Sequence, residues 1–257
     1  MMLIYGAVLL LIWSLLGWWV QQRTANGGYA DVVWAYGVGA VSLMYLWMGD
    51  GVWLVRLVAA VLLGFWSWRL GTHILTRVLG DAEEGRYRAM REALGERIGL
   101  FHFFFFLGQG LLAWLFALPA FVISGHPGPV QPLWLLLGGV LGVVALIGES
   151  TADRQLAQFR EDPAHRGKTC REGLWRYSRH PNYFFEWLHW FSYPVLAIGA
   201  PGAPWLWLAP LMMWLFLWFV TGIPYTERQA LKSRGEDYRR YQRTTSAFFP
   251  WRPRHDG

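Results

Sequence analysis

Long apolar runs joined by short connections constrain this chain more than any other feature of its sequence. Seven runs approach the roughly 20 residues that an α-helix needs to cross a bilayer, and they occupy residues 1–20, 31–48, 52–75, 100–123, 132–148, 181–198 and 205–220. Hydrophobic residues make up 54% of the chain, which fits a membrane protein. We therefore predict one all-α domain, residues 1–257, with seven transmembrane helices.

The first run, residues 1–20, has no basic segment ahead of it and no small-residue cleavage pattern. We expect it to be a retained span rather than a signal peptide. The helical pattern of the fifth run continues beyond residue 148 into polar sequence, so this helix is expected to extend out of the membrane.

Lys and Arg lie in alternate connections. Nearly all of them fall in residues 21–30, 77–97 and 154–179 and in the C-terminal tail, whereas the other three connections, 49–51, 124–131 and 199–204, contain none. Positive connections stay on the cytoplasmic side of a membrane, so the N-terminus is expected outside and the C-terminus in the cytosol. The net charge of +6 is then a topology signal, and no nucleic-acid partner is predicted.

The sequence offers no metal or disulfide site. Its single cysteine, Cys170, cannot form an intrachain disulfide, and its seven histidines show neither HxxxH nor HExxH spacing. We therefore predict no metal ligand set.

The stretch 173–186, GLWRYSRHPNYFFE, places ionisable groups directly before and inside the sixth run. Such groups are costly at membrane depth and usually mark a site or a pathway. Pro181 suits the first position of a helix. The helix start would then bring free backbone N–H groups and a positive dipole end beside Arg179 and His180, a combination that attracts an anion.

Asn182 and Glu186 follow one turn apart and share a helix face. The amide of Asn182 and the carboxylate of Glu186 suit a carboxamide ligand. The alternative is a structural role, in which Glu186 forms an ion pair with an arginine of another span.

Two further segments carry candidate ligands. Glu149, Asp153 and Arg160 lie at spacings of four and seven, so they share one face just beyond the membrane. This face is either a solvated ion-pair surface or a site in which the carboxylates accept from ribose or amide donors and Arg160 binds phosphate.

The third run and the connection after it add two arginines. Trp66, Arg69 and His73 share a face, and Arg69 either snorkels to the interface or lines a polar cavity. Arg86 is either a topology charge or a phosphate ligand.

These motifs together resemble the bacterial members of the steroid 5α-reductase-like family, which is related to the sterol C14 reductases. The resemblance covers roughly residues 60–257 and rests on R-H-P-N-Y-x-x-E at 179–186, on Asp153 with Arg160 as D-x6-R, and on an ending of Glu227, Tyr238, Tyr241, Thr244 and Phe249-Pro250-Trp251. R-H-P-x-Y also occurs in isoprenylcysteine and phospholipid methyltransferases. The acid four residues after the Asn favours the reductases.

The resemblance implies a seven-helix fold that binds NADPH in its cytosolic half and an enone in a cavity open to lipid. Cofactor-binding elements are expected mainly in 66–97 and 149–251, without a Rossmann domain, because no G-x-G-x-x-G follows a strand. The implied cofactor ligands are Asn182 and Glu186 for the nicotinamide end, Glu149, Asp153 and Arg160 for ribose and phosphate, Arg69, Arg86, Arg179 and His180 for further anionic groups, and Tyr183, Tyr238 and Tyr241 for the pocket wall.

The substrate end departs from the family. The steroid reductases hold the ketone with a Glu on the second span and a Tyr on the third. Trp66 stands near the Tyr position here, and Asp31 or Tyr36 could serve from the second span.

Three hypotheses follow. The leading one is an NADPH-dependent reductase of a conjugated C=C bond in a hydrophobic molecule taken from the bilayer, in a bacterial inner membrane, with the cofactor site facing the cytoplasm. The alternatives are a lipid or isoprenoid methyltransferase that uses S-adenosylmethionine, and a non-catalytic membrane binding or scaffold protein that has kept the pocket without turnover. A monomer is consistent with all three.

Overall fold

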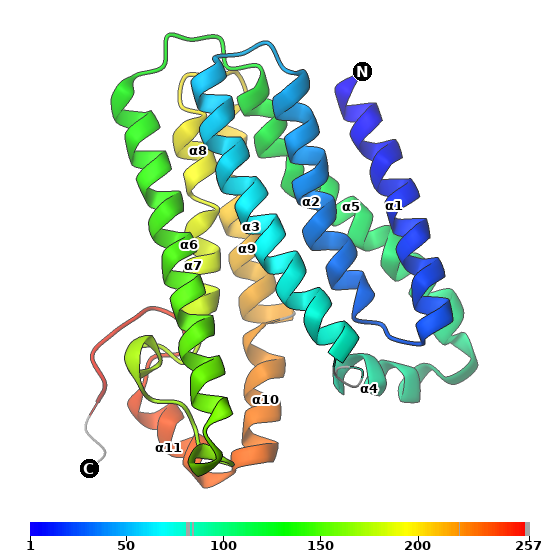
Figure 1. The fold of residues 1–257 in the computed structure, drawn as a ribbon, viewed down its shortest axis with the longest axis vertical. Coiled ribbons are helices and arrows are strands. Elements are labelled where there is room, and N and C mark those ends of the chain that lie inside the picture. The colour runs from blue at the N-terminus through cyan, green and yellow to red at the C-terminus, as the bar shows by residue number, and fades with distance from the viewer. Residues whose placement is uncertain (81–82, 84, 221, 255–257) are drawn as a thin grey trace. The chain divides into compact units, whose positions relative to one another are not determined.

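The computed structural model describes residues 1–80, 83, 85–220 and 222–254 (Figure 1). In this part of the chain the ordered structure is helical and contains no strand, which confirms the all-α prediction. The α-helices are α1 (Met2–Thr24), α2 (Tyr29–Met48), α3 (Trp53–Gly80), α4 (Gly85–Leu94), α5 (Ile98–Ser124), α6 (Pro132–Glu161), α7 (Pro181–His189), α8 (Ser192–Leu196), α9 (Leu208–Leu215), α10 (Ile223–Arg234) and α11 (Glu236–Thr244), and a π-helical turn, Phe216–Val220, follows α9.

Six helical segments of the described chain are long and apolar enough to cross a membrane. They are Met2–Thr24, Tyr29–Met48, Trp53–Gly80, Tyr87–Ser124, Pro132–Glu161 and Ala203–Arg234. The fifth continues without a break from its apolar half into the polar residues up to Glu161, as predicted. The chain is therefore a multi-pass integral membrane protein.

The expected sixth span, residues 181–198, forms two short helices, α7 and α8, instead of one long helix. Pro194 explains the break, because its ring carries no N–H and collides with the carbonyl four residues back. That carbonyl belongs to Trp190, and the helix tightens there into i−3 hydrogen bonds, with Trp190 N–H donating to Trp187 and Phe191 N–H donating to Leu188.

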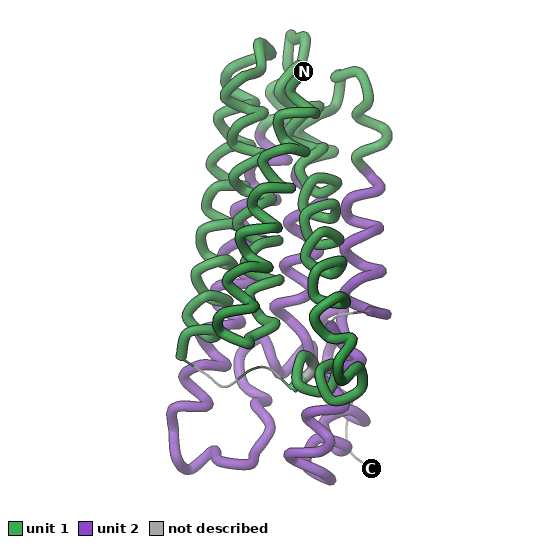
Figure 2. Tube along the Cα trace, turned by 90° about the vertical axis from the view of Figure 1, so that its right-hand side faces the viewer, with its two compact units in different colours: residues 1–135, 193–206 green, residues 136–192, 207–257 purple. Residues whose placement is uncertain are grey.

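The chain divides into two compact units (Figure 2). The first comprises residues 1–135 and 193–206, and in it α2 packs against α1, α3 and α5. Close approach depends on small residues. A Cβ on Gly39 of α2 would lie 2.1 Å from Ser67 Oγ of α3, and that hydroxyl donates to the carbonyl of Ala35 at 2.9 Å.

The connections without Lys or Arg meet at one end of the first unit. Gly51 N–H donates to Ser124 O at 2.9 Å, Val52 N–H donates to His126 O at 3.0 Å, and His126 Nε2 lies 3.0 Å from Ile198 O.

Two of the basic connections of the first unit also meet each other. Asn26 Nδ2 donates to Val78 O at 3.2 Å, and Glu83 accepts from Gly27 N–H at 2.8 Å and from Arg91 Nη2 at 2.9 Å. In this unit, connections without Lys or Arg contact one another, and the basic connections contact one another, as the charge pattern predicts.

The second unit comprises residues 136–192 and 207–257. Within it, α6 and α7 come close because Gly148 has no side chain: a Cβ there would lie 2.4 Å from two ring atoms of Phe185. Trp175 Nε1 donates to Ala152 O at 2.9 Å and Trp187 Nε1 donates to Pro210 O at 3.1 Å, so the segment before α7 is tied to α6, and α7 itself to α9.

Candidate functional site

The start of α7 has the geometry that the sequence predicted. His180 is the N-cap residue and Pro181 occupies the first helical turn. Asn182 Nδ2 donates to Asp153 Oδ1 at 3.2 Å, and Asn182 Oδ1 accepts from the N–H of Tyr183 at 3.0 Å. The predicted ligands on α6 and α7 are therefore brought together at Asp153 and Asn182.

Two buried carboxylates flank this contact. Glu149 lies one turn before Asp153 on α6, and Glu186 lies one turn after Asn182 on α7, with relative exposures of 4% and 6%. Glu186 Oε1 accepts from Trp190 Nε1 at 3.0 Å. We call Glu149, Asp153, Asn182 and Glu186 the α6–α7 polar face.

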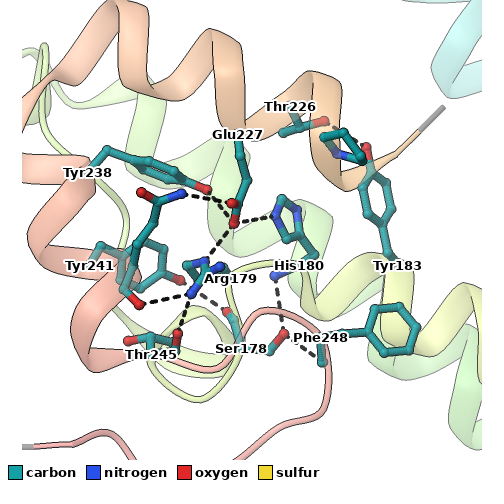
Figure 3. A network of polar contacts seen from close by, with 12 residues as sticks. Ser178, Arg179, His180, Tyr183, Thr226, Glu227, Tyr238, Tyr241, Thr245 and Phe248 are labelled. Carbon is teal, nitrogen blue, oxygen red and sulfur yellow. Dashed lines mark hydrogen bonds and ion pairs between the residues drawn. The ribbon is translucent and has the colours of Figure 1, made fainter. Parts of the chain in front are cut away.

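Behind the start of α7 lies a second polar cluster, centred on Glu227 of α10 (Figure 3). Glu227 Oε1 accepts from Arg179 Nε at 2.6 Å, from Tyr238 O–H at 3.4 Å and from the ring Nε2 of His180 at 3.3 Å. Its other oxygen accepts from Gln242 Nε2 at 2.7 Å. The carboxylate is thus surrounded by four donors, and this set of five residues is the Glu227 network.

Arg179 and His180, predicted to attract an anion, direct their side chains at the chain's own C-terminal part. Arg179 also donates from Nη1 to Gln242 O at 3.0 Å and to Thr245 O at 2.6 Å, while its backbone N–H donates to Ser246 O. Burial lowers the pKa of His180 below its usual value. The imidazole is therefore neutral near pH 7, with Nε2–H as the donor to Glu227.

Tyr238 and Tyr241 also belong to this region as structural hydrogen-bond donors. The Tyr241 hydroxyl donates to the carbonyl of Trp175. It also donates to the carbonyl of Ser178 (Figure 3). Burial raises the pKa of both phenols, and for Tyr238 the charge of Glu227 raises it further. Tyr183 instead stacks on the His180 ring, with centroids 5.3 Å apart, and its hydroxyl lies 3.2 Å from Thr226 Oγ1.

A basic pocket of about 340 Å³ lies at the C-terminal end of α6, the end that the charge pattern predicts to be cytosolic. It is lined by Arg160 and Phe159 at the end of α6, by residues of the loop that follows, and by Arg234 at the end of α10. Among its lining residues in the described chain, Arg160, Arg166, Lys168 and Arg234 are cationic and none is acidic. Such a lining favours an anionic ligand.

The wall of the basic pocket includes an aromatic stack and a thiol. The His165 ring lies parallel to Phe159 with centroids 4.1 Å apart. Burial raises the pKa of the Cys170 thiol, so it stays protonated and unreactive near neutral pH. Arg160 lies seven residues after Asp153, about 10 Å along the same face of α6. The basic pocket and the α6–α7 polar face are thus two parts of one helix surface.

The remaining predicted residues lie in the first unit. Asp31 Oδ2 accepts from the Tyr87 hydroxyl at 3.0 Å, and the Tyr36 hydroxyl lies 2.9 Å from Thr72 Oγ1. Trp66 is fully buried, with Trp34 edge-on at 5.6 Å between centroids. Arg69 is half-buried one turn further along α3, and the side chain of Arg86 lies outside the described residues.

Several site residues were not predicted. Glu227 appeared in the sequence only as part of the C-terminal resemblance, and Arg166, Lys168 and Arg234 appeared only as topology charges. The clustering of basic residues at 160–171 was the available signal. Neither motif spacing nor charge count could show that Arg234, some 70 residues away, completes the same pocket.

The helical architecture and six candidate spans define the class, a multi-pass integral membrane protein. The chain belongs to the family described as "Protein of unknown function (DUF1295)", whose match covers residues 17–245 and which is related to the steroid 5α-reductases. A curated relative, an uncharacterized protein of Schizosaccharomyces pombe, is 27% identical over 276 aligned residues, covering 96% of this chain and 79% of the relative. The resemblance drawn from the sequence is confirmed at the level of this relationship.

Proposed function

We propose that this protein is an NADPH-dependent reductase of a conjugated C=C bond in a hydrophobic, membrane-dissolved enone. The observation that carries the proposal is the surface of α6, on which the α6–α7 polar face and the basic pocket are separated by about two helical turns. A nicotinamide dinucleotide has a carboxamide at one end and phosphates toward the other, and this surface offers matching groups in the same order.

The carboxamide end suits the α6–α7 polar face. Asn182 carries a second amide N–H beyond the one that Asp153 accepts, and carboxylates accept amide N–H bonds. Both Glu186 and Glu149 are buried, so a hydrogen bond to either would be little weakened by water. In this proposal Asp153 accepts from a ribose hydroxyl.

The phosphate end suits the basic pocket. Arginine binds phosphate through paired N–H groups. Two arginines line the pocket, Arg160 from α6 and Arg234 from α10. Lys168 adds a further point charge. S-adenosylmethionine carries a cationic sulfonium and no phosphate. A pocket whose described lining has four cationic residues and no acidic one therefore favours the dinucleotide over the methyl donor.

When bound, NADPH would supply the hydride. Hydride arrival at the β-carbon of an enone places negative charge on the ketone oxygen, which a fixed donor must stabilise, and a proton must reach the α-carbon. Tyr36 is the proposed donor candidate, and within the first unit its hydroxyl lies 2.9 Å from Thr72 Oγ1. Asp31, which accepts from the Tyr87 hydroxyl, and Trp66 are the other proposed substrate residues of the first unit.

The proposed topology places the cofactor on the cytosolic side of a bacterial inner membrane. It has seven crossings, with α7 and α8 together forming the sixth, and an N-terminus outside. The basic residues of 154–179 and of the tail support this orientation.

The test is transfer of deuterium. Protein in nanodiscs is incubated with NADPH deuterated at the transferable C4 position and with a panel of steroid, isoprenoid and lipid enones, and products are analysed by mass spectrometry. The proposal predicts a saturated ketone that has gained one deuterium and one hydrogen, and a loss of this product in Glu186→Ala. Methylated lipid formed from S-adenosylmethionine would establish the methyltransferase instead, and NADPH binding without turnover of any enone would favour the non-catalytic alternative.

A further inference from the structure

An aromatic groove of about 290 Å³ lies in the second unit, and its composition differs from that of the α6–α7 polar face. Its lining is almost wholly apolar and includes Trp187 and Phe191 from α7 and the turn after it, Trp207, Leu211 and Trp214 from the α9 region, and Phe249 from the C-terminal segment. Its volume lies at the lower end of the range for small-molecule sites, about 300–1,000 Å³. It therefore has room for part of a hydrocarbon chain rather than for a large ligand.

The groove opens on exposed apolar side chains, some of which belong to a candidate membrane span. Trp207 and Leu211 belong to the candidate span Ala203–Arg234 and are nearly half exposed, and Phe249 is 52% exposed. Trp187 is fixed from behind, because its Nε1 donates to Pro210 O and its ring contacts Phe248 at 5.6 Å between centroids. The groove is thus an aromatic recess in an exposed apolar surface, part of which belongs to a candidate membrane span.

A basic and aromatic surface, which we call the rim, begins two residues after the groove residue Phe249 along the chain. Trp251 N–H donates to Tyr177 O at 2.9 Å, and this bond holds two chain segments together that each carry an exposed aromatic ring and an exposed arginine. The rings are Trp251, at 74% exposure, and Tyr177, and the arginines are their neighbours Arg252 and Arg176. Two extended residues span about 7 Å, so the rim lies within headgroup reach of Phe249.

Exposed Trp and Tyr are enriched where a membrane meets water, and arginine binds phosphate diesters of the headgroups there. We propose that the groove and this rim form a binding site for one anionic phospholipid, with an acyl chain in the aromatic groove and the headgroup phosphate at Arg176 and Arg252. The occupant is anionic because the rim is doubly positive, with Glu172 as the nearest acid along the segment that carries Arg176. The site is independent of the cofactor and of the reaction proposed above.

The experiment is native mass spectrometry of the full chain released from nanodiscs of phosphatidylglycerol and phosphatidylcholine in equal parts. The protein is expected to retain one phosphatidylglycerol in preference to phosphatidylcholine. Arg176→Gln and Arg252→Gln should each lower the preference about five-fold, as expected for one surface arginine at an anionic headgroup. Arg97→Gln, at an exposed arginine of the first unit, is the matched control and should leave the preference unchanged.

A groove-filling variant, Leu211→Trp, separates the acyl part from the headgroup part. It should reduce retention of both lipids while the thermal unfolding midpoint stays near that of the unmodified chain. Equal retention of the two lipids by the unmodified protein would overturn the proposal. So would an unchanged preference in the double variant Arg176→Gln/Arg252→Gln, or a dimer that Leu211→Trp dissociates without a change in bound lipid.

Discussion

At the scale of single residues, Glu227 organises the polar interior of the second unit. Its carboxylate joins α10 to Arg179 and His180 before α7 and to Tyr238 and Gln242 of α11. The side chains of Arg179 and Glu227 are 11% and 15% exposed. Water can therefore hydrate either charge only poorly if the ion pair is broken. Glu227 is therefore one of the main attachments of α11, beside the hydrogen bonds of Tyr241 to Trp175 and Ser178.

We expect Glu227→Gln to destabilise the protein strongly, because it leaves the Arg179 guanidinium buried without its carboxylate. Loss of one partner of a buried pair costs about 3–5 kcal/mol. The matched control is Glu236→Gln, whose ion pair with Arg239 is largely exposed and should change the free energy of unfolding by less than about 1 kcal/mol. Thermal unfolding in detergent would compare the two, and equal midpoints would contradict the account.

The raised pKa values of Tyr238 and Tyr241 predict how the free energy of unfolding changes at alkaline pH. Burial raises both pKa values above 10, so above about pH 10 the unfolded chain loses phenolic protons that the folded chain keeps. Their contribution is fully present below pH 10 and falls as pH rises beyond it, by up to about 1.4 kcal/mol per pH unit for each phenol. The double variant Tyr238→Phe/Tyr241→Phe should show a flatter fall than Tyr177→Phe in pH-dependent unfolding, whereas parallel curves would refute the assignment.

Single residues were predicted from the sequence where helical spacing decided their position. Asp153, Asn182 and Glu186 fall on the predicted faces, and the first two are in contact. Glu227 could not be assigned a partner, because its donors range from Arg179, 48 residues upstream, to Gln242, 15 residues downstream, and no local pattern links them.

At the scale of elements, the sequence identified six of the long helices and misjudged one. The run 181–198 is apolar enough for a span, but hydropathy does not register the hydrogen bond that Pro194 removes. The fifth run shows the opposite case: its pattern continued into polar residues, and α6 continues with it.

Close packing of α6 and α7 at Gly148 sets the geometry of the α6–α7 polar face. We expect Gly148→Ala to push α7 away, because the new methyl group would meet the Phe185 ring, at a cost of about 1–3 kcal/mol. It should also weaken NADPH binding, since Asn182 moves with α7. Phe185→Leu in the same chain should restore both.

Gly108→Ala provides the control for the helix itself. No atom lies within 4 Å of a Cβ at that position in α5, and the change should be neutral or stabilising by up to about 1 kcal/mol. If Gly148→Ala behaves like Gly108→Ala in unfolding and in cofactor titration, close packing does not position α7.

At the scale of the whole molecule, charge and hydropathy predicted which connections belong together. The connections 49–51 and 124–131 meet each other, and 124–131 also contacts Ile198, directly before the connection 199–204, while 21–30 meets 77–97. The grouping into two compact units was not predictable. The first unit includes residues 193–206, which follow the first segment of the second unit in the sequence, and contacts over such separations leave no periodic signal.

Labelling with an impermeant maleimide in inverted and right-side-out vesicles would test the proposed orientation. The native Cys170 is buried, so background labelling should be low. We expect Asp50→Cys to react only in right-side-out vesicles and Arg97→Cys only in inverted ones. The reverse pattern would place the proposed cofactor site on the wrong side for cytosolic NADPH.

The most direct test of the central claim is a titration of the purified protein in nanodiscs with NADPH and, separately, with S-adenosylmethionine, followed by thermal shift. The account predicts saturable stabilisation by NADPH alone, lost in Asn182→Ala and Glu186→Ala and weakened in Arg160→Gln. The exposed Arg97→Gln should bind as the unmodified chain does. Stabilisation by S-adenosylmethionine alone, or NADPH binding that survives all three site variants, would contradict the account.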